Sequence, residues 1–339
     1  MKNNLFYYAT KELSQDAFIC WLCSYAGEGT ASKDTALTEC AEHLLCEFIG
    51  ADKGSVLSEI EIRKQYKNID VLILLKCQGE QYAVIVEDKT HSSEHDDQLD
   101  RYRNTVSAMF PDYKLVCVYY KTGFQSDYSK VEKSGYKIFG RKKNLEILGE
   151  YVNRTDNDIF KDYYAYWENY EEITGSYRDI EISKWDDGRQ VNGFYEYVQD
   201  ELTNKNQYWT GYGWVNNRSG GFWGLWYGID DDHIIDEGVE ATLYLQVEIQ
   251  WDYDNNKYAV NICLKLERKD ADDNIFALRD KLFGMMGEYG FNKPRNVRTA
   301  THMTVGIYDA AYTTYIDLMD AIKEAAKKYT KLIGVFRSI

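Results

Sequence analysis

Residues 69–89, IDVLILLKCQGEQYAVIVEDK, decide the fold of the first half of the chain. Two apolar runs, 69–75 and 82–89, stand on either side of a short polar segment at residues 78–79. Apolar runs of this length next to a turn signal are typical of buried central strands. We therefore expect two neighbouring strands that pair through the turn.

The flanking segments alternate between helical and strand patterns. Upstream, residues 11–26 and 34–50 repeat apolar positions at helical spacing, and residues 56–63 alternate as a strand does. Downstream, the same criteria predict a helix at 94–110, strands at 113–121 and 136–139, and a helix at roughly 145–170. The resulting α, βββ, α, β order predicts an α/β core built on a three-stranded meander.

Charged residues mark the ends of the two central strands. Asp70 opens the first strand, while Glu87 and Lys89, two positions apart, leave the same face of the second. If the strands pair, the two carboxylates lie side by side, and with the carbonyl of Asp88 they form a hard oxygen site for Mg²⁺ or Mn²⁺. Lys89 is then placed to orient a water or to stabilise a phosphoryl oxyanion. A plain solvated strand end is the simpler interpretation of any one of these charges.

This combination resembles the core of the PD-(D/E)xK nuclease superfamily, with Ile69 in place of the motif's proline. The resemblance covers residues ~5–140 and implies an αβββαβ restriction-endonuclease-like core. It also implies a metal-dependent hydrolase that acts on nucleic acid, with DNA as the expected substrate. A role in prokaryotic defence or repair rests on the same analogy.

Two further segments extend the resemblance. QLDRY, residues 98–102, is similar to the Q-x-x-x-Y motif of RecB-like nucleases, which implies that Gln98 and Tyr102 shape the site. TKELSQDAFICWL resembles the opening helix of a bacterial subgroup, and Glu12 is the candidate metal ligand on that helix. Alternatively, Tyr102 belongs to the core, and Glu12 is a solvated residue favoured near a helix start.

The cysteines and the absence of apolar spans indicate the compartment. No apolar run approaches the ~20 residues that a membrane span needs, and the seven cysteines show no disulfide framework. Cys20 and Cys23 lie three residues apart on a predicted helix. The cysteines downstream of residue 89 are too few to complete an iron–sulfur site, so we interpret Cys20 and Cys23 as core residues. We expect a cytoplasmic protein with reduced thiols and no membrane partner.

The chain changes character near residue 175, which predicts domains at 1–175 and 176–339. From residue 189 on, aromatic residues and glycine dominate and indicate antiparallel strands, followed by a helix at 271–289, a strand at 301–308 and a helix at 312–330. Residues 1–150 hold 19 Lys and Arg against 23 Asp and Glu, a net charge of −4, whereas the rest holds 21 against 32, a net charge of −11. This acidity argues against broad phosphate-backbone binding by the second, α+β domain. Its aromatic stretch 207–228 builds a core or stacks bases, with the core preferred.

The leading hypothesis is a Mg²⁺-dependent deoxyribonuclease with Asp70, Glu87, Lys89, Gln98 and Tyr102 in its active site. The alternative is a catalytically silent nuclease-fold module that binds a protein or nucleic acid, with the second domain as the docking surface. The basic residues Arg63, Lys64 and Lys67 flank the catalytic strands and either contact phosphates or form a solvated face. A binding module need not keep the complete Asp/Glu/Lys set, so its presence favours the enzyme.

Overall fold

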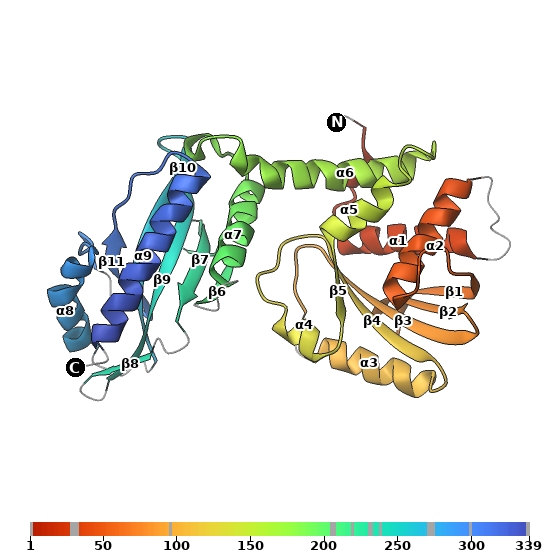
Figure 1. Cartoon of the computed structure of the whole chain (residues 1–339), viewed down its shortest axis with the longest axis horizontal. Helices are drawn as coiled ribbons and strands as arrows, with labels where there is room; N and C mark the ends of the chain where they lie inside the picture. The colour runs from red at the N-terminus through yellow and green to blue at the C-terminus, as the bar shows by residue number, and fades with distance from the viewer. Residues whose placement is uncertain are drawn as a thin grey trace. The chain divides into compact units, whose positions relative to one another are not determined.

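The computed structural model describes residues 3–27, 34–94, 97–203, 208–217, 220–229, 233–236, 239–269, 275–297 and 300–336. Contacts divide the chain into two compact units, Met1–Glu171 and Glu172–Ile339. The colours of Figure 1 run from red to green through the first unit and from green to blue through the second. The roles assigned above to domains 1–175 and 176–339 stay predictions.

A mixed five-stranded sheet forms the centre of the first unit. The strands are β1 Leu57–Tyr66, β2 Ile69–Cys77, β3 Glu80–Lys89, β4 Lys114–Lys121 and β5 Lys137–Gly140, in the order β1-β2-β3-β4-β5. The first three are antiparallel neighbours, and β4 and β5 run parallel to β3. The predicted meander and the following α, β order are confirmed.

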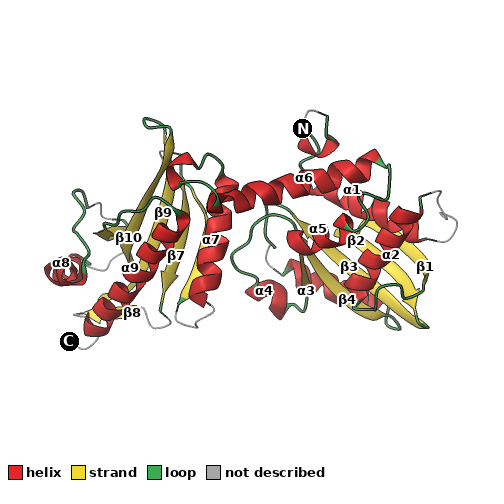
Figure 2. Cartoon of the chain, turned by 45° about the horizontal axis from the view of Figure 1, so that its top comes forward, coloured by secondary structure: helices red, strands yellow, loops and turns green. Residues whose placement is uncertain are grey.

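Helices cover both faces of this sheet (Figure 2). Side chains of four helices build the larger core: α1 Glu12–Cys23, α2 Thr35–Ile49, α5 Arg141–Gly149 and α6 Asp158–Gly175. Side chains of two others build the smaller core: α3 Gln98–Met109 and α4 Ser129–Lys133. Strand β2 alternates between them, since Val71 and Ile73 belong to the larger core and Leu72 and Leu74 to the smaller one. At the start of the strand, Ile69 also belongs to the smaller core, and Asp70 accepts a hydrogen bond from Gln65.

The β2–β3 hairpin fixes the register at the charged end of the sheet. Its two-residue loop has Gln78 at φ 52° and Gly79 at φ 85°, and positive φ at both positions matches the twist of the flanking strands. Val71 pairs with Val86 in the resulting ladder. Asp70 and Glu87 are the next residues outward on the two strands.

Strand β1 lies at one edge of the sheet, and its pairing with β2 is irregular. The register shifts between Ser58 and Glu61, which is a β-bulge. Glu59, inside the bulge, has φ 49°, a left-handed conformation that is uncommon for a residue with a side chain. The ladder with β2 is therefore interrupted at Glu59 and Ile60, and a bulge of this kind bends its strand.

The second unit contains an antiparallel sheet with the order β11-β10-β9-β7-β6, and β8 pairs with β9. Its strands are β6 Trp209–Val215, β7 Phe222–Gly228, β8 His233–Asp236, β9 Val239–Asp252, β10 Lys257–Arg268 and β11 His302–Tyr308. Its helices are α7 Gly188–Thr203, α8 Phe276–Met285 and α9 Tyr315–Phe336. The predicted α+β class is confirmed. Short 3-10 helices occur at Leu5–Tyr7, Ser24–Ala26, Ser176–Arg178, Ile182–Lys184 and Met286–Tyr289.

Helices α7 and α9 pack on the same face of this second sheet. The Tyr212 ring of β6 lies 6.1 Å from the Tyr195 ring of α7, and the Tyr227 hydroxyl of β7 donates to the Ile322 carbonyl of α9 at 3.5 Å. Tyr212 pairs with Leu225, which lies on the same face as Tyr227. The alternate residues of these strands therefore point to the opposite face.

Three sequence predictions were wrong in detail. Helix α7 occupies residues 188–203, where no helix was expected. The predicted helix at 145–170 is two helices, because the Asn157 side chain accepts the Phe160 N–H and caps a new start. The helix predicted at 94–110 begins at Gln98, with residues 95–96 outside the described part, as are 271–274 of the helix predicted at 271–289. No helix in the described ranges has the length and apolar character of a membrane span.

Candidate active site

Asp70, Glu87 and Lys89 meet at the end of the β2–β3 hairpin. The Lys89 Nζ lies 2.5 Å from Glu87 Oε1 and 3.8 Å from Asp70 Oδ2. The same ammonium donates to the carbonyl of Asp88 at 3.2 Å. The backbone N–H of Asp88 donates to Asp70 Oδ2 at 3.0 Å and holds that carboxylate against β3. The strand pairing thus brings together the parts that the sequence places at the two strand ends.

Burial sets the protonation of this cluster. Glu87 is fully buried, and burial together with repulsion from Asp70 raises the pKa of Glu87 to about 7, against the lowering effect of Lys89. Burial acts to lower the pKa of Lys89, but the negative charges of Glu87 and Asp70 outweigh it, so the Lys89 pKa is raised. The lysine therefore stays charged, while Glu87 exchanges its proton near neutrality.

The oxygen atoms in this cluster fit a hard divalent cation. Oxygens of Asp70, Glu87 and Asp88 converge on one positive charge, the Lys89 ammonium, which stands in for such an ion. The second carboxylate oxygen of Glu87 is buried and has no hydrogen-bond partner among the described residues. Within the same ranges, no group of three His, Cys, Asp or Glu side chains is placed to hold a metal. The oxygens that could hold an ion here are therefore those of two carboxylates and the Asp88 carbonyl, and their role as ligands stays a prediction.

Glu12 lies next to this cluster on α1. Its Oε1 accepts the backbone N–H of Thr90 at 3.0 Å and the hydroxyl of Ser92 at 2.8 Å. Burial acts to raise the pKa of Glu12, but these hydrogen bonds and the charge of Lys89 lower it. An ionised Glu12 thus ties α1 to the segment that follows β3. Its metal-binding role stays a prediction.

Gln98 and Tyr102 contact each other on α3. Gln98 Nε2 donates to the Tyr102 hydroxyl at 3.0 Å, and the Tyr102 ring is buried in the smaller core. The carbonyl oxygen of Gln98 is buried and has no hydrogen-bond partner in the part of the chain that the structure describes. Helix α3 packs on the face of β3 that carries Ile85 and, by alternation, Glu87. Whether they act in catalysis stays a prediction.

A second buried polar cluster lies on the α1 side of the sheet and was not predicted. The side chain of Asp88 is fully buried there and accepts a hydrogen bond from Gln15 Nε2. Asp16 is also buried, and burial followed by repulsion from Asp70 raises its pKa to about 6. The signal in the sequence is the spacing of Glu12, Gln15 and Asp16, which places three polar residues on one helical face.

Lys121 is another functional candidate that the sequence analysis missed. It ends β4 and pairs in register with Lys89, so two lysines close adjacent parallel strands. Lys121 is buried and donates to the Ser92 carbonyl at 2.5 Å. Burial lowers its pKa to about 8. Its signal was the single charge at the end of the apolar strand at 113–121.

The predicted core role of the two helical cysteines is confirmed. Cys23 is fully buried in the larger core, and Cys20 is partly buried against it. All seven cysteines are free thiols. Burial raises the pKa of Cys20 to about 11, which keeps this thiol protonated and poorly suited to ligate a metal.

Comparison with known proteins gives one finding. A family model described as the PD-(D/E)XK nuclease superfamily matches residues 4–188, more than half of the chain. No curated protein and no solved structure matches the chain. The matched range includes all of the β2–β3 cluster, Glu12, and the Gln98–Tyr102 pair.

Proposed function

The chain belongs to the PD-(D/E)XK nuclease superfamily, and from this premise we propose that it is a metal-dependent deoxyribonuclease. Asp70, Glu87 and the carbonyl of Asp88 are the proposed ligands of one Mg²⁺ or Mn²⁺ ion. The observation that carries the proposal is the convergence of these oxygens on the Lys89 ammonium. A structural ion pair would need only one carboxylate beside the lysine.

Hydrolysis joins a water oxygen to phosphorus and breaks the bond to the sugar oxygen, which takes up a proton. A bound divalent ion supplies Lewis acidity toward the phosphoryl oxygen and a lower pKa for a bound water. Asp70 and Glu87 hold negative charge at the strand ends, and the Asp88 N–H fixes the orientation of Asp70. Lys89 presents a compact positive charge to the developing charge on the phosphoryl oxygens.

We propose that the RecB-like features belong to the same site. The Gln98 amide donates to the Tyr102 hydroxyl, and we expect the pair to shape the site where the substrate binds. Glu12 supplements the metal ligands or positions the loop at Ser92. Tyr102→Phe tests the first part, because it removes the hydroxyl and keeps the ring in the core. We expect slower turnover with an unchanged melting temperature.

Cleavage assays test the central proposal. The full chain, freed of metal with EDTA, is incubated with labelled linear, circular and single-stranded DNA, and with RNA, in Mg²⁺, Mn²⁺ or EDTA. We expect metal-dependent cleavage of DNA that Asp70→Asn and Glu87→Gln abolish. Glu80→Gln is the matched control, since Glu80 begins the same strand and pairs with Lys114 at the surface. Cleavage that persists in both site variants would refute the assignment.

A measurement of metal binding distinguishes the proposed enzyme from the catalytically silent module. Calorimetry with Mn²⁺ should show a saturable site that Asp70→Ala removes and Glu80→Gln keeps. A folded protein that does not bind Mn²⁺ and does not cleave any substrate would instead support the catalytically silent binding module. A protein partner of the second unit belongs to that alternative.

A further inference from the structure

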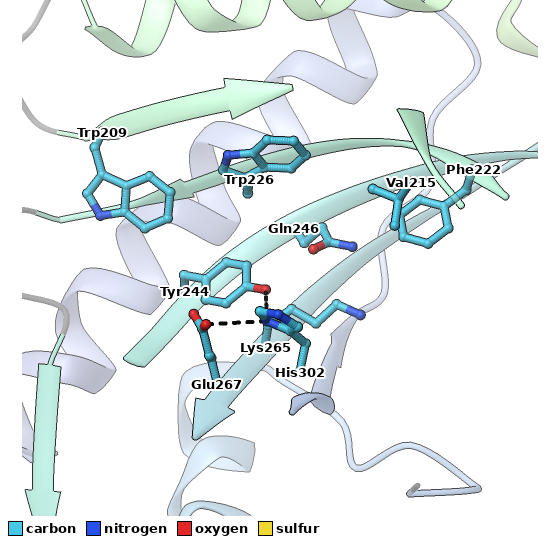
Figure 3. Close-up of a pocket in the computed structure, with 9 residues that line it drawn as sticks. All are labelled: Trp209, Val215, Phe222, Trp226, Tyr244, Gln246, Lys265, Glu267 and His302. Atoms are coloured by element: carbon cyan, nitrogen blue, oxygen red, sulfur yellow. Dashed lines mark hydrogen bonds and ion pairs between the residues drawn. The ribbon is translucent and has the colours of Figure 1, made fainter. Parts of the chain in front are cut away.

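A cavity of about 530 Å³ lies in the second unit, within the size range of small-molecule sites. Figure 3 shows its walls, which carry Trp209, Trp226, Tyr244 and Phe222 with polar groups between them. Trp226 pairs with Gln246 across β7 and β9, and Leu225 pairs with Val247. By alternation, the cavity lies on the face of the sheet opposite α7 and α9.

Two reciprocal pairs of tryptophan and glycine build the aromatic wall. Trp209 lies opposite Gly228, and Trp226 lies opposite Gly211, on the paired strands β6 and β7. A Cβ atom on Gly228 would come within 2.6 Å of the Trp209 ring, and one on Gly211 within 2.3 Å of the Trp226 indole nitrogen. Each indole therefore covers the backbone of a glycine. Glycine weakens a strand interior, and here it permits close approach of a ring.

The polar groups of the cavity are buried and held in place. Gln246 Nε2 donates to Glu248 Oε1 at 2.9 Å. Lys265 Nζ lies 2.6 Å from the same oxygen and donates to Thr304 Oγ1 at 2.8 Å. Because Gln246 and Lys265 are both buried, these contacts orient donors and acceptors before any ligand enters.

The polar groups near the cavity contact one another. Lys265 is paired with Glu248. The His302 ring lies 3.9 Å from Glu267 and 3.3 Å from the Tyr244 hydroxyl, and the dashed lines in Figure 3 mark these two contacts. The one lysine among the described residues that line the cavity is thus already paired with a carboxylate and is poorly placed to bind a phosphate. A ligand suited to this site is uncharged, with flat faces for the indoles and a polar edge for Gln246.

We propose that this cavity binds a nucleobase, either of a free nucleoside or of an unpaired nucleotide in a single strand. The choice of a base over other flat molecules rests on the proposed nuclease function. Stacking of a base on an aromatic side chain tolerates any base, while the ordered polar groups select among the base edges. The net charge of −11 outside residues 1–150 is compatible with a free nucleoside, because that ligand carries no charge.

Binding measurements in EDTA test the proposal independently of cleavage. The full-length Asp70→Asn variant is titrated with each of four nucleosides and with a short single-stranded oligonucleotide, followed by calorimetry. We expect saturable binding of at least one nucleoside or of the oligonucleotide, weakened about tenfold by Trp226→Ala. Trp226→Phe, which keeps an apolar ring over Gly211, should weaken it less and serves if the alanine variant does not fold. Trp214→Ala is the matched control, since Trp214 is exposed and does not line the cavity.

The two sources of the base give different results. Nucleoside binding without oligonucleotide binding identifies a free ligand, whereas oligonucleotide binding that Trp226→Ala removes identifies a base in a strand. Choline and glucose are the competing probes, for a cation or a sugar on the indoles. Binding of either of these in place of every nucleoside, or equal affinity in the Trp226→Ala and Trp214→Ala variants, overturns the proposal. If the wild-type chain cleaves no nucleic acid but the cavity still binds a base, the proposed nuclease function is refuted and the base-binding proposal is not.

Discussion

Lys89 occupies the point where the oxygens of Asp70, Glu87 and Asp88 meet. Lys89→Ala should lower turnover by roughly two orders of magnitude, the usual scale for losing a preorganised charge-stabilising group. Mn²⁺ affinity should stay equal or rise, because a competing cation has gone. Cleavage rates at saturating Mg²⁺ and Mn²⁺ calorimetry on the folded variant measure the two effects.

Two further substitutions serve as the comparison and the control for Lys89→Ala. Lys89→Arg should rescue poorly, since a planar guanidinium does not replace a compact ammonium. Lys114→Ala, on the neighbouring strand at the sheet's other end, should leave turnover unchanged. Equal rates for wild type and Lys89→Ala would remove the lysine from the mechanism.

The raised pKa of Glu87 predicts an unusual pH dependence of the free energy of unfolding in the metal-free protein. Its pKa rises from an ordinary 4.5 to about 7 on folding, so the folded state holds this proton more tightly than the unfolded state. The stabilisation is complete below about pH 4.5 and is lost as the pH rises through 7, a change of up to roughly 3 kcal/mol. Asp16, with its pKa raised to about 6, acts in the same direction.

Denaturation in EDTA between about pH 4.5 and pH 8 measures this slope. Glu87→Gln should flatten it, and Glu80→Gln should not. Because a proton and a divalent ion compete for the Glu87 carboxylate, Mn²⁺ affinity should increase with pH and level off above about 7. A wild-type slope equal to that of Glu87→Gln would show that burial of Glu87 does not control its proton.

The central residues of the site could be predicted because their signals are local. Strand alternation places Glu87 and Lys89 on one face, and the turn signal at residues 78–79 pairs their strand with the one that Asp70 opens. Lys121 needed the parallel pairing of β3 with β4, which depends on a crossover through α3 and has no turn signal in the sequence. Asp16 looked like an ordinary helical carboxylate, since its burial depends on how α1 packs on the sheet.

Among the elements, the β2–β3 hairpin controls the site because its turn sets the register of Asp70 against Glu87. Gly79→Ala should destabilise the protein by about 1 kcal/mol, since φ 85° strains any residue with a Cβ atom. Gly140→Ala is the control, with φ −88° and open space around it, and should change stability by less than about 0.5 kcal/mol. Urea denaturation compares the two. An equal effect would mean that the turn tolerates side chains.

A strand could be predicted where an apolar run stands next to a turn signal, as in β2 and β3. Helix α7 was not, although Val191, Phe194, Val198 and Leu202 recur at helical spacing, because aromatic residues and glycine dominate the stretch that follows. The reciprocal Trp–Gly pairs of β6 and β7 also escaped prediction. Their partners lie on different strands, and only the register reveals which glycine faces which ring.

For the whole molecule, the net charge of −15 limits binding to the phosphate backbone. We expect any such binding to depend on the first unit, where Lys67 lies in the turn just before Asp70. Lys67→Glu in the Asp70→Asn background should weaken binding of duplex DNA by about fivefold. Lys257→Glu, at an exposed position beside the β9–β10 turn, should leave it unchanged. The affinity for duplex DNA is measured at two salt concentrations. Equal losses of affinity in the Lys67→Glu and Lys257→Glu variants would show that the phosphate contacts lie elsewhere.

The bulge in β1 has a consequence for the protein at high concentration. A straight edge strand offers a row of backbone groups onto which another molecule can add a strand, and such growth ends in aggregates. The left-handed Glu59 and the register shift between Ser58 and Glu61 interrupt that row. Charged side chains further along β1, among them Arg63, add repulsion and hydration. Deleting Glu59 would straighten the edge, and fibrils would then be expected in stored samples.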